Sequence, residues 1–73
     1  MSELPQLSGR DCVNALTKVG FRQKRQHGSH IILRRDEPFA QLVVPDHKEL
    51  DRGMLRAIIR QASLSVDEFN ALL

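Results

Sequence analysis

Apolar residues recur every three or four positions between Gly9 and about Val19, which is the spacing of one face of a helix. The stripe consists of Cys12, Ala15, Leu16 and Val19. Ser8 is placed to cap this helix, because a serine hydroxyl can accept a hydrogen bond from the third helical backbone N–H. Gly20 can end the helix in a left-handed conformation. The pattern predicts a first helix that follows an extended lead-in over residues 1–7.

A second helical stripe follows Asp51, which is the expected N-cap, and continues to about Gln61. Its apolar members are Leu55, Ile58, Ile59 and Ala62, and its polar face carries Arg52, Arg56 and Arg60. Near the end of the chain, Ser65 and Glu68 have the spacing of a reciprocal capping pair. This pair predicts a short third helix that runs through Phe69 to the last leucines.

Three stretches between these helices have the length and the bounding turn residues of β-strands. They are residues 21–26, 30–35 and 39–44. Gly28 can adopt a positive φ, so the segment 27–29 is expected to be a tight turn. Pro38 cannot donate within a strand ladder and marks a second turn over residues 36–38. Turns this short favour an antiparallel meander with strand 30–35 in the middle.

The central strand has one apolar side and one mixed side. Ile31 and Leu33 point one way, whereas His30, Ile32 and Arg34 point the other. Helices with one apolar stripe need a surface to cover, so the two main helices are expected to pack on the Ile31 and Leu33 side. The predicted fold is α+β, in the order α-β-β-β-α with a short extra C-terminal helix, as one domain over residues 1–73. The helices cover one face of a three-stranded antiparallel sheet, and His30 lies on the open face unless the register shifts by one residue.

Charge is distributed unevenly along the chain, although the net charge is only +2. Between residues 21 and 35 there is no acidic residue, and the basic residues there are Arg22, Lys24, Arg25, Arg34 and Arg35. A positive surface of this kind suits a phosphate-bearing partner. The alternative is a solvated sheet face whose lysines and arginines protect the strand edges. Aromatic residues make up 4% of the chain, without Trp or Tyr, which excludes RNA binding on a platform of sheet aromatics.

Cys12 is the only cysteine, so the chain cannot form an internal disulfide, as suits a reducing cytoplasm. Its place in the helical stripe indicates a small core residue and not a nucleophile. The first ten residues lack the basic-then-apolar pattern of a signal peptide, and no apolar run approaches the ~18 residues that span a membrane. We expect a soluble, intracellular protein.

His30 is the residue best suited to chemistry. A histidine changes charge near neutral pH, with an ordinary pKa of about 6.5, and can act as a general acid or base. On RNA it could activate a ribose 2′-hydroxyl toward the adjacent phosphodiester, while neighbouring cations stabilise the developing charge. Such a reaction needs neither a metal nor a covalent enzyme intermediate. The alternative is that His30 is an exposed strand residue, or only binds phosphate.

Other candidate chemistry has less support in the sequence. His27 and His30 are not accompanied by cysteines, and CxxC and HxxxH spacings are absent, so we expect no metal site and no cofactor. His47 follows a strand and is expected to have a turn or capping role. Ser29 is first a turn residue and second a hydrogen-bond partner for phosphate. GxSxG, Walker and GxGxxG patterns are also absent.

Several short motifs occur in a fixed order along the chain. They are Leu4-Pro5, Ser8-Gly9, Gly20-Phe21, Gly28-Ser29-His30, Val43-Val44-Pro45, His47, Glu49-Leu50, Gly53 with Leu55, Ile58, and Gln61-Ala62 before Leu64. Through this ordered set the sequence resembles the HicA family of type II toxins over nearly its whole length. Met54 departs from the pattern, because many members have a small polar residue before the leucine.

The resemblance implies a double-stranded-RNA-binding-domain-like fold and the activity of a ribosome-independent mRNA interferase. The histidine of the Gly-Ser-His turn is catalytic in the family, and this role is carried over to His30. Candidate RNA contacts beside it are Gly28, Ser29, Arg22, Lys24, Arg25 and Arg34. The expected partners are an mRNA substrate and a HicB-type antitoxin that covers the active surface, with which a higher-order toxin–antitoxin complex can form. Two alternatives stay open: a non-catalytic RNA-binding module of the same fold, and a protein-interaction domain whose open sheet docks an antitoxin-like partner.

Overall fold

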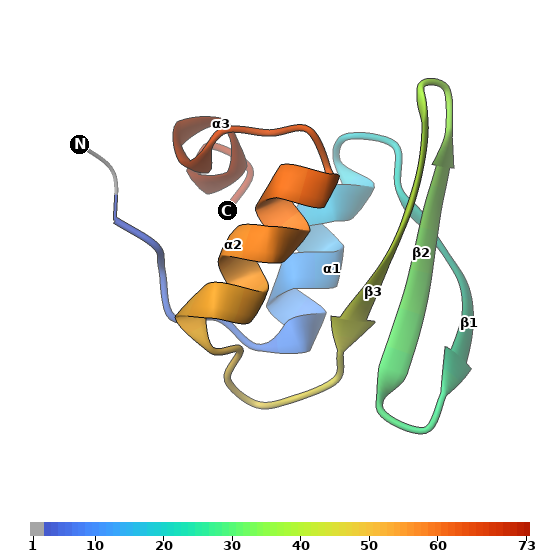
Figure 1. Ribbon diagram of the computed structural model, residues 1–73, viewed down its shortest axis with the longest axis horizontal. Helices are drawn as coiled ribbons and strands as arrows, with labels where there is room; N and C mark the ends of the chain where they lie inside the picture. Colours follow the sequence, from blue (N-terminus) through green and yellow to red (C-terminus); the bar gives the residue numbers. More distant parts are fainter. Residues whose placement is uncertain (1–2) are drawn as a thin grey trace.

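The computed structural model describes residues 3–73, whose helices and strands follow the order α-β-β-β-α-α (Figure 1). The helices are α1 (Gly9–Thr17), α2 (Arg52–Gln61) and α3 (Val66–Asn70), and the strands are β1 (Arg22–His27), β2 (His30–Asp36) and β3 (Phe39–Pro45). The strands form one antiparallel sheet with β2 in the middle. The predicted α+β fold, its element order and the meander are confirmed. Residues 3–7 of the predicted lead-in have no regular secondary structure, and residues 1–2 lie outside the described residues.

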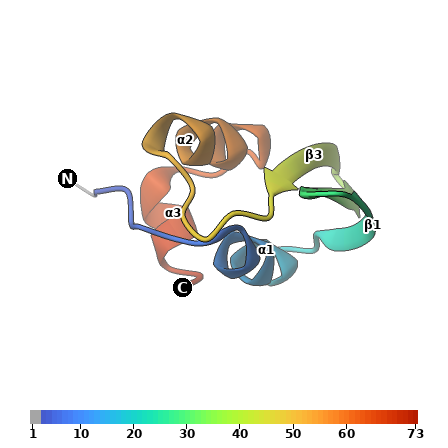
Figure 2. The same ribbon diagram turned by 90° about the horizontal axis from the view of Figure 1, so that it is seen from below.

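The helices lie on one side of the sheet, as Figure 1 shows. Both α1 and α2 contact β3, and α3 contacts α2. Seen from below in Figure 2, α1 and α2 run next to each other, with the sheet at one end of this layer and α3 at the other. The opposite face of the sheet carries no helix from the described part of the chain. It is therefore open, as the one-sided apolar pattern of β2 predicts.

Each helix begins at its predicted capping residue. The Ser8 hydroxyl accepts a hydrogen bond from the Asp11 N–H at 3.0 Å, and the Asp51 carboxylate accepts one from the Met54 N–H at 2.8 Å. Ser65 caps α3 with the reciprocal pair of bonds that the sequence indicates. These side chains satisfy backbone donors that have no partner inside a helix.

The ends of several elements differ slightly from the sequence-based expectation. Helix α1 ends at Thr17 and not at Val19, because the N–H groups of Lys18 and Val19 donate to carbonyls three residues earlier, as in a 3₁₀ turn. Gly20 follows with a φ of 96°, the left-handed conformation expected for it. Strand β1 is displaced by one residue and includes His27, and β2 and β3 each continue one residue further than predicted.

One hydrophobic core fills the space between the helices and the sheet. Its largest fully buried side chains are Phe21, Phe69, Leu16, Ile31, Leu33, Leu55, Ile58, Val44 and Cys12. Ile31 and Leu33 are 0% exposed, whereas His30 is exposed and Ile32 and Arg34 are only half-buried. The predicted register of the central strand is therefore confirmed.

Helix α1 begins against the loop that leaves β3. The Gly9 N–H donates to the His47 carbonyl at 2.8 Å, and the Leu50 N–H donates to the Leu7 carbonyl at 2.8 Å. A Cβ atom on Gly9 would overlap the Pro45 carbonyl oxygen. Only glycine allows this approach, which fixes the start of α1 beside the end of β3.

Replacing Gly9 with alanine should therefore destabilise the protein. We expect Gly9→Ala to lower the free energy of unfolding by about 1–3 kcal/mol, since a backbone atom must move to admit the methyl group. Gly53→Ala is the matched control, because its Cβ would meet only Asp51 Oδ1 at 3.4 Å in the first turn of α2. The control should gain up to about 1 kcal/mol from the better helix propensity of alanine. Urea denaturation measures both, and equal stability of Gly9→Ala and wild type would contradict the close approach.

Candidate functional site

The open face of the sheet is built from rows of directly opposed residues, which point to the same side in an antiparallel pair. The first row holds His27, His30 and Pro45, the second Arg25, Ile32 and Val43, and the third Arg22, Arg34 and Gln41. Histidines thus occupy the end of this face next to the β1–β2 turn. Arg25 shares the second row with the apolar Ile32 and Val43, and Arg22 and Arg34 occupy the third row.

His30 enters β2 directly after a two-residue turn made by Gly28 and Ser29. The turn is shorter than predicted, because His27 belongs to β1 and pairs with His30. Gly28 has a φ of 56°, and a Cβ there would meet no atom within 4 Å. Glycine is thus needed here for its backbone conformation and not for space. The turn leaves both His27 and His30 exposed.

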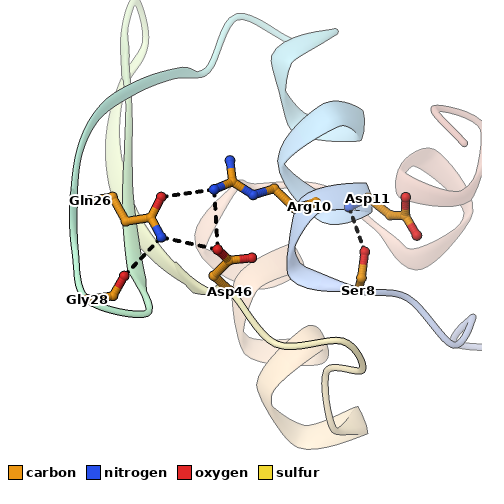
Figure 3. A network of polar contacts seen from close by, with 6 residues as sticks. All are labelled: Ser8, Arg10, Asp11, Gln26, Gly28 and Asp46. Carbon is orange, nitrogen blue, oxygen red and sulfur yellow. Dashed lines mark hydrogen bonds and ion pairs between the residues drawn. The ribbon is translucent and has the colours of Figure 1, made fainter.

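The turn before His30 is held by polar contacts from behind the sheet (Figure 3). Gln26 Nε2 donates to the Gly28 carbonyl at 2.9 Å and to Asp46 Oδ2 at 3.1 Å. Arg10 Nη2 donates to Gln26 Oε1 at 3.0 Å and to Asp46 Oδ2 at 3.2 Å. Sequence reasoning missed Arg10, Gln26 and Asp46 as a group. The only sequence indication was that Gln26 and Asp46 directly flank a predicted turn and a predicted strand end.

Strand β1 contains an irregularity that changes which cations face outward. Gln23 pairs with Leu33 and Arg25 with Ile32, so Lys24 is the extra residue of a bulge. Arg22 and Arg25 consequently lie on the same open face, although strict alternation would place them on opposite faces.

The cations lie along the sheet and do not surround His30. Arg25 is one row away from His30, and Arg34 is four residues further along β2, or about 13 Å at the usual strand rise. The residues opposite His30 are His27 and Pro45. Arg34 shares the open face with His30, but a phosphate held by Arg34 would lie well away from the histidine.

A polar cavity of about 370 Å³ opens at the far end of the sheet from His30. Its lining residues are Gly20, Arg22, Lys24, Arg34, Arg35, Asp36 and Glu37. Arg34 Nε donates to Asp36 Oδ1 at 2.9 Å, so part of its charge is compensated. The Arg35 guanidinium lies 4.7 Å from the centroid of the Phe21 ring and donates to the Pro38 carbonyl at 2.9 Å. In the sequence Arg35 stands out only as a member of the basic stretch, whereas the structure brings it to the same cavity as three candidate RNA contacts.

The other polar candidates, Ser29 and His47, contribute backbone carbonyls to hydrogen bonds that hold the fold. Ser29 is exposed in the turn, and its carbonyl accepts a hydrogen bond from the Asp46 N–H at 2.6 Å. His47 has an exposed side chain, and its carbonyl bonds the start of α1. Among residues 3–73, no three His, Cys, Asp or Glu side chains gather as a metal site would require. In the same range, none of the helices has the length and apolarity needed to cross a membrane.

Cys12 is a core residue, as its place in the helical stripe predicts. Its side chain is 0% exposed, and burial raises the pKa of the thiol to about 12. The thiolate, which is the nucleophilic form, is therefore scarce in the folded protein at neutral pH.

The fold and the site together define a class of small α-β-β-β-α proteins with helices on one face of the sheet and histidines and arginines on the other. The model of the family described as "HicA toxin of bacterial toxin-antitoxin" matches residues 9–64, which is more than half of the chain. The chain belongs to this HicA toxin family, which confirms the resemblance and makes the protein a toxin of a bacterial toxin–antitoxin system. The comparison with curated proteins gives no match.

The buried thiol gives a direct test of the core. At pH 8, a pKa of about 12 leaves only about one thiol in 10⁴ ionised, so Cys12 should react with iodoacetamide far more slowly in the native protein than in urea. Because the unfolded thiol ionises near pH 9 and the folded thiol does not, this group makes stability fall as the pH rises above 9. The Cys12→Ala variant should lack this contribution to the fall in stability above pH 9. Fast alkylation of the native protein would contradict the burial.

Proposed function

We propose that the protein is an mRNA interferase, a metal-independent endoribonuclease in which His30 acts as a general acid or base. The observation that carries this proposal is the placement of His30, which is exposed at the end of an open face whose other rows carry arginines. Membership of a family of toxins supports the same reading, because cleavage of mRNA in the cytoplasm would arrest growth. A non-catalytic RNA-binding module of the same fold is the alternative.

In the proposed reaction, the imidazole of His30 takes the proton of a ribose 2′-hydroxyl. The 2′-oxygen then forms a bond to the adjacent phosphorus, and the bond from phosphorus to the 5′-oxygen breaks. The leaving 5′-oxygen takes up a proton from water, and the protonated His30 then returns its proton to water, so the products are a cyclic phosphate and a free 5′-hydroxyl. His27 opposes His30 across the turn and is the other titratable side chain in that row. General acid–base catalysis of this kind contributes about 10²–10⁴-fold to a rate.

The arginines are proposed to bind the RNA backbone next to the reacting phosphate. Arg25 lies one row from His30 and is the cation nearest to it in the sheet register. Arg22, Lys24 and Arg34 converge on the far cavity, where they would hold a phosphate more distant along the strand. Gly28 and Ser29 would meet the RNA at the turn itself. Contacts far from the reacting bond should affect affinity more than the chemical step.

A HicB-type antitoxin is the proposed protein partner, bound over the same open face and able to form a higher-order complex. Phe39 and Val43 are 68% and 44% exposed and lie on this face, where Val43 opposes the half-buried Ile32 and Phe39 opposes Asp36 at the far end. Apolar side chains exposed among cations are typical of a surface that another protein covers.

The catalytic role of His30 can be tested with purified protein and a labelled RNA. His30→Ala should lower kcat by about 10²–10⁴-fold and leave RNA binding and the melting temperature close to those of the wild type. His47→Ala is the matched control, because its exposed side chain lies in a loop, and it should cleave normally. Equal activity of His30→Ala and wild type would refute the catalytic role. Normal binding without cleavage by the wild type itself would favour the RNA-binding module.

The role of Arg34 predicts a change in the salt dependence of RNA binding. Each phosphate contact with a single strand contributes about 0.7 to the slope of log K against log salt, so Arg34→Gln should reduce that slope by about this amount. Asp36→Asn removes the carboxylate that pairs with Arg34, and it should strengthen binding. Arg60→Gln, on the exposed side of α2, controls for net charge. Identical slopes for Arg34→Gln and Arg60→Gln would contradict the assignment of Arg34 as a phosphate contact.

A further inference from the structure

Three side chains from separate parts of the chain meet behind the turn that leads into His30. Arg10 comes from the first turn of α1, Gln26 from the end of β1 and Asp46 from the loop after β3. Figure 3 shows that their polar ends point toward one another, with Gln26 also directed at Gly28. We call Arg10, Gln26 and Asp46 the turn clamp.

The turn clamp holds both residues of the turn by their backbone carbonyls. The Gly28 carbonyl accepts from Gln26 Nε2 at 2.9 Å, and the Ser29 carbonyl accepts from the Asp46 N–H at 2.6 Å. Gln26 itself is held on both ends of its amide, by Arg10 at Oε1 and by Asp46 at Nε2. The peptide groups directly before His30 are thus tied to the helical layer and to the end of β3.

Apolar packing contributes little to holding this part of the sheet. All six residues of β1 are exposed, and β1 is an edge strand that pairs only with β2. Because β1 buries none of its side chains, the position of the β1–β2 turn depends on the pairing with β2 and on polar contacts. The clamp supplies such contacts, and the segments that carry Arg10 and Asp46 are joined next to it, because the Gly9 N–H donates to the His47 carbonyl at 2.8 Å.

We propose that Arg10, Gln26 and Asp46 are positioning residues that fix the location of His30 for its reaction with RNA. The inference rests on the proposed catalytic role of His30. Gln26 opposes the buried Ile31 and so lies on the helix side of the sheet, whereas His30 lies on the open side. The clamp therefore acts through the turn backbone and leaves the RNA-binding face free. Displacement of a catalytic group by about 1 Å can cost about 10²-fold in rate, which makes such support effective.

The first test compares two Gln→Met variants on the same strand. Gln26→Met removes the contacts to Gly28, Arg10 and Asp46 while keeping the side-chain length. Gln23→Met is the control, since Gln23 lies on the same side of the sheet and makes no side-chain hydrogen bond within residues 3–73. We expect Gln26→Met to lower kcat by about tenfold to a hundredfold with KM and melting temperature unchanged. Equal kcat values for the two variants would overturn the proposal. A fall in kcat that is explained by a lower melting temperature of Gln26→Met would overturn it as well.

A second test reverses the polarity of one contact and then restores it. Gln26→Glu places a carboxylate against Asp46 Oδ2 and the Gly28 carbonyl, so it should lower kcat more than Gln26→Met does. Adding Asp46→Asn supplies an amide donor to the new carboxylate, and the double variant should recover part of the lost kcat. If the double variant recovers none of the lost kcat, the contact between the side chains at positions 26 and 46 is not the cause of the loss.

A third measurement separates the clamp from the catalytic proposal. Hydrogen exchange of the Asp46 amide, which donates to Ser29, should become faster in Gln26→Met and stay unchanged in Gln23→Met. If the wild type fails to cleave RNA, the proposed function is wrong, whatever this exchange rate shows. If His30→Ala abolishes cleavage while Gln26→Met changes neither kcat nor the exchange rate of the Asp46 amide, the catalytic role of His30 is supported and the positioning role of the turn clamp is refuted.

Discussion

The burial of Ile31 and Leu33 against the helices is the interaction on which the arrangement of the site depends. Each of these side chains gains about 1.5–3 kcal/mol from full burial. A shift of β2 by one residue would expose both and bury Arg34, whose charge pairs with the exposed Asp36. The register is therefore fixed by the core, and the outward position of His30 follows from it.

Local rules account for most of the fold that the sequence predicted. Ser8, Asp51 and Ser65 cap their helices with bonds to residues three positions away, and such short-range pairs are visible in the sequence. The alternation in β2 is equally local, because the core on one side and water on the other sort its residues by polarity. The helix and strand ends shift by one or two residues where the last hydrogen bonds depend on neighbouring elements.

The site was less predictable, because two of its features depend on pairing between distant residues. Six exposed polar residues in β1 offer no apolar alternation that could reveal the bulge at Lys24, although this bulge decides that Arg22 and Arg25 share a face. The turn clamp joins residues that are 16, 20 and 36 positions apart. Spacing within a helix or strand carries no information about such contacts. The outward direction of His30 was predictable because the alternation of polar and apolar residues in β2 indicates it, whereas its chemical role rests on the proposal.

The two faces of the sheet are stabilised differently. On the helix side, apolar packing holds β2 and β3, and the polar clamp holds the turn of the otherwise exposed β1. On the open side, no residue is needed to hold the helices, so His30 and the arginines are free to meet a ligand. Polar contacts suit the edge of such a small protein, since a chain of 73 residues has few apolar side chains left to bury there. An edge strand whose turn is fixed from behind by hydrogen bonds can leave all its side chains exposed and still hold His30, the first residue of the next strand, in a defined place.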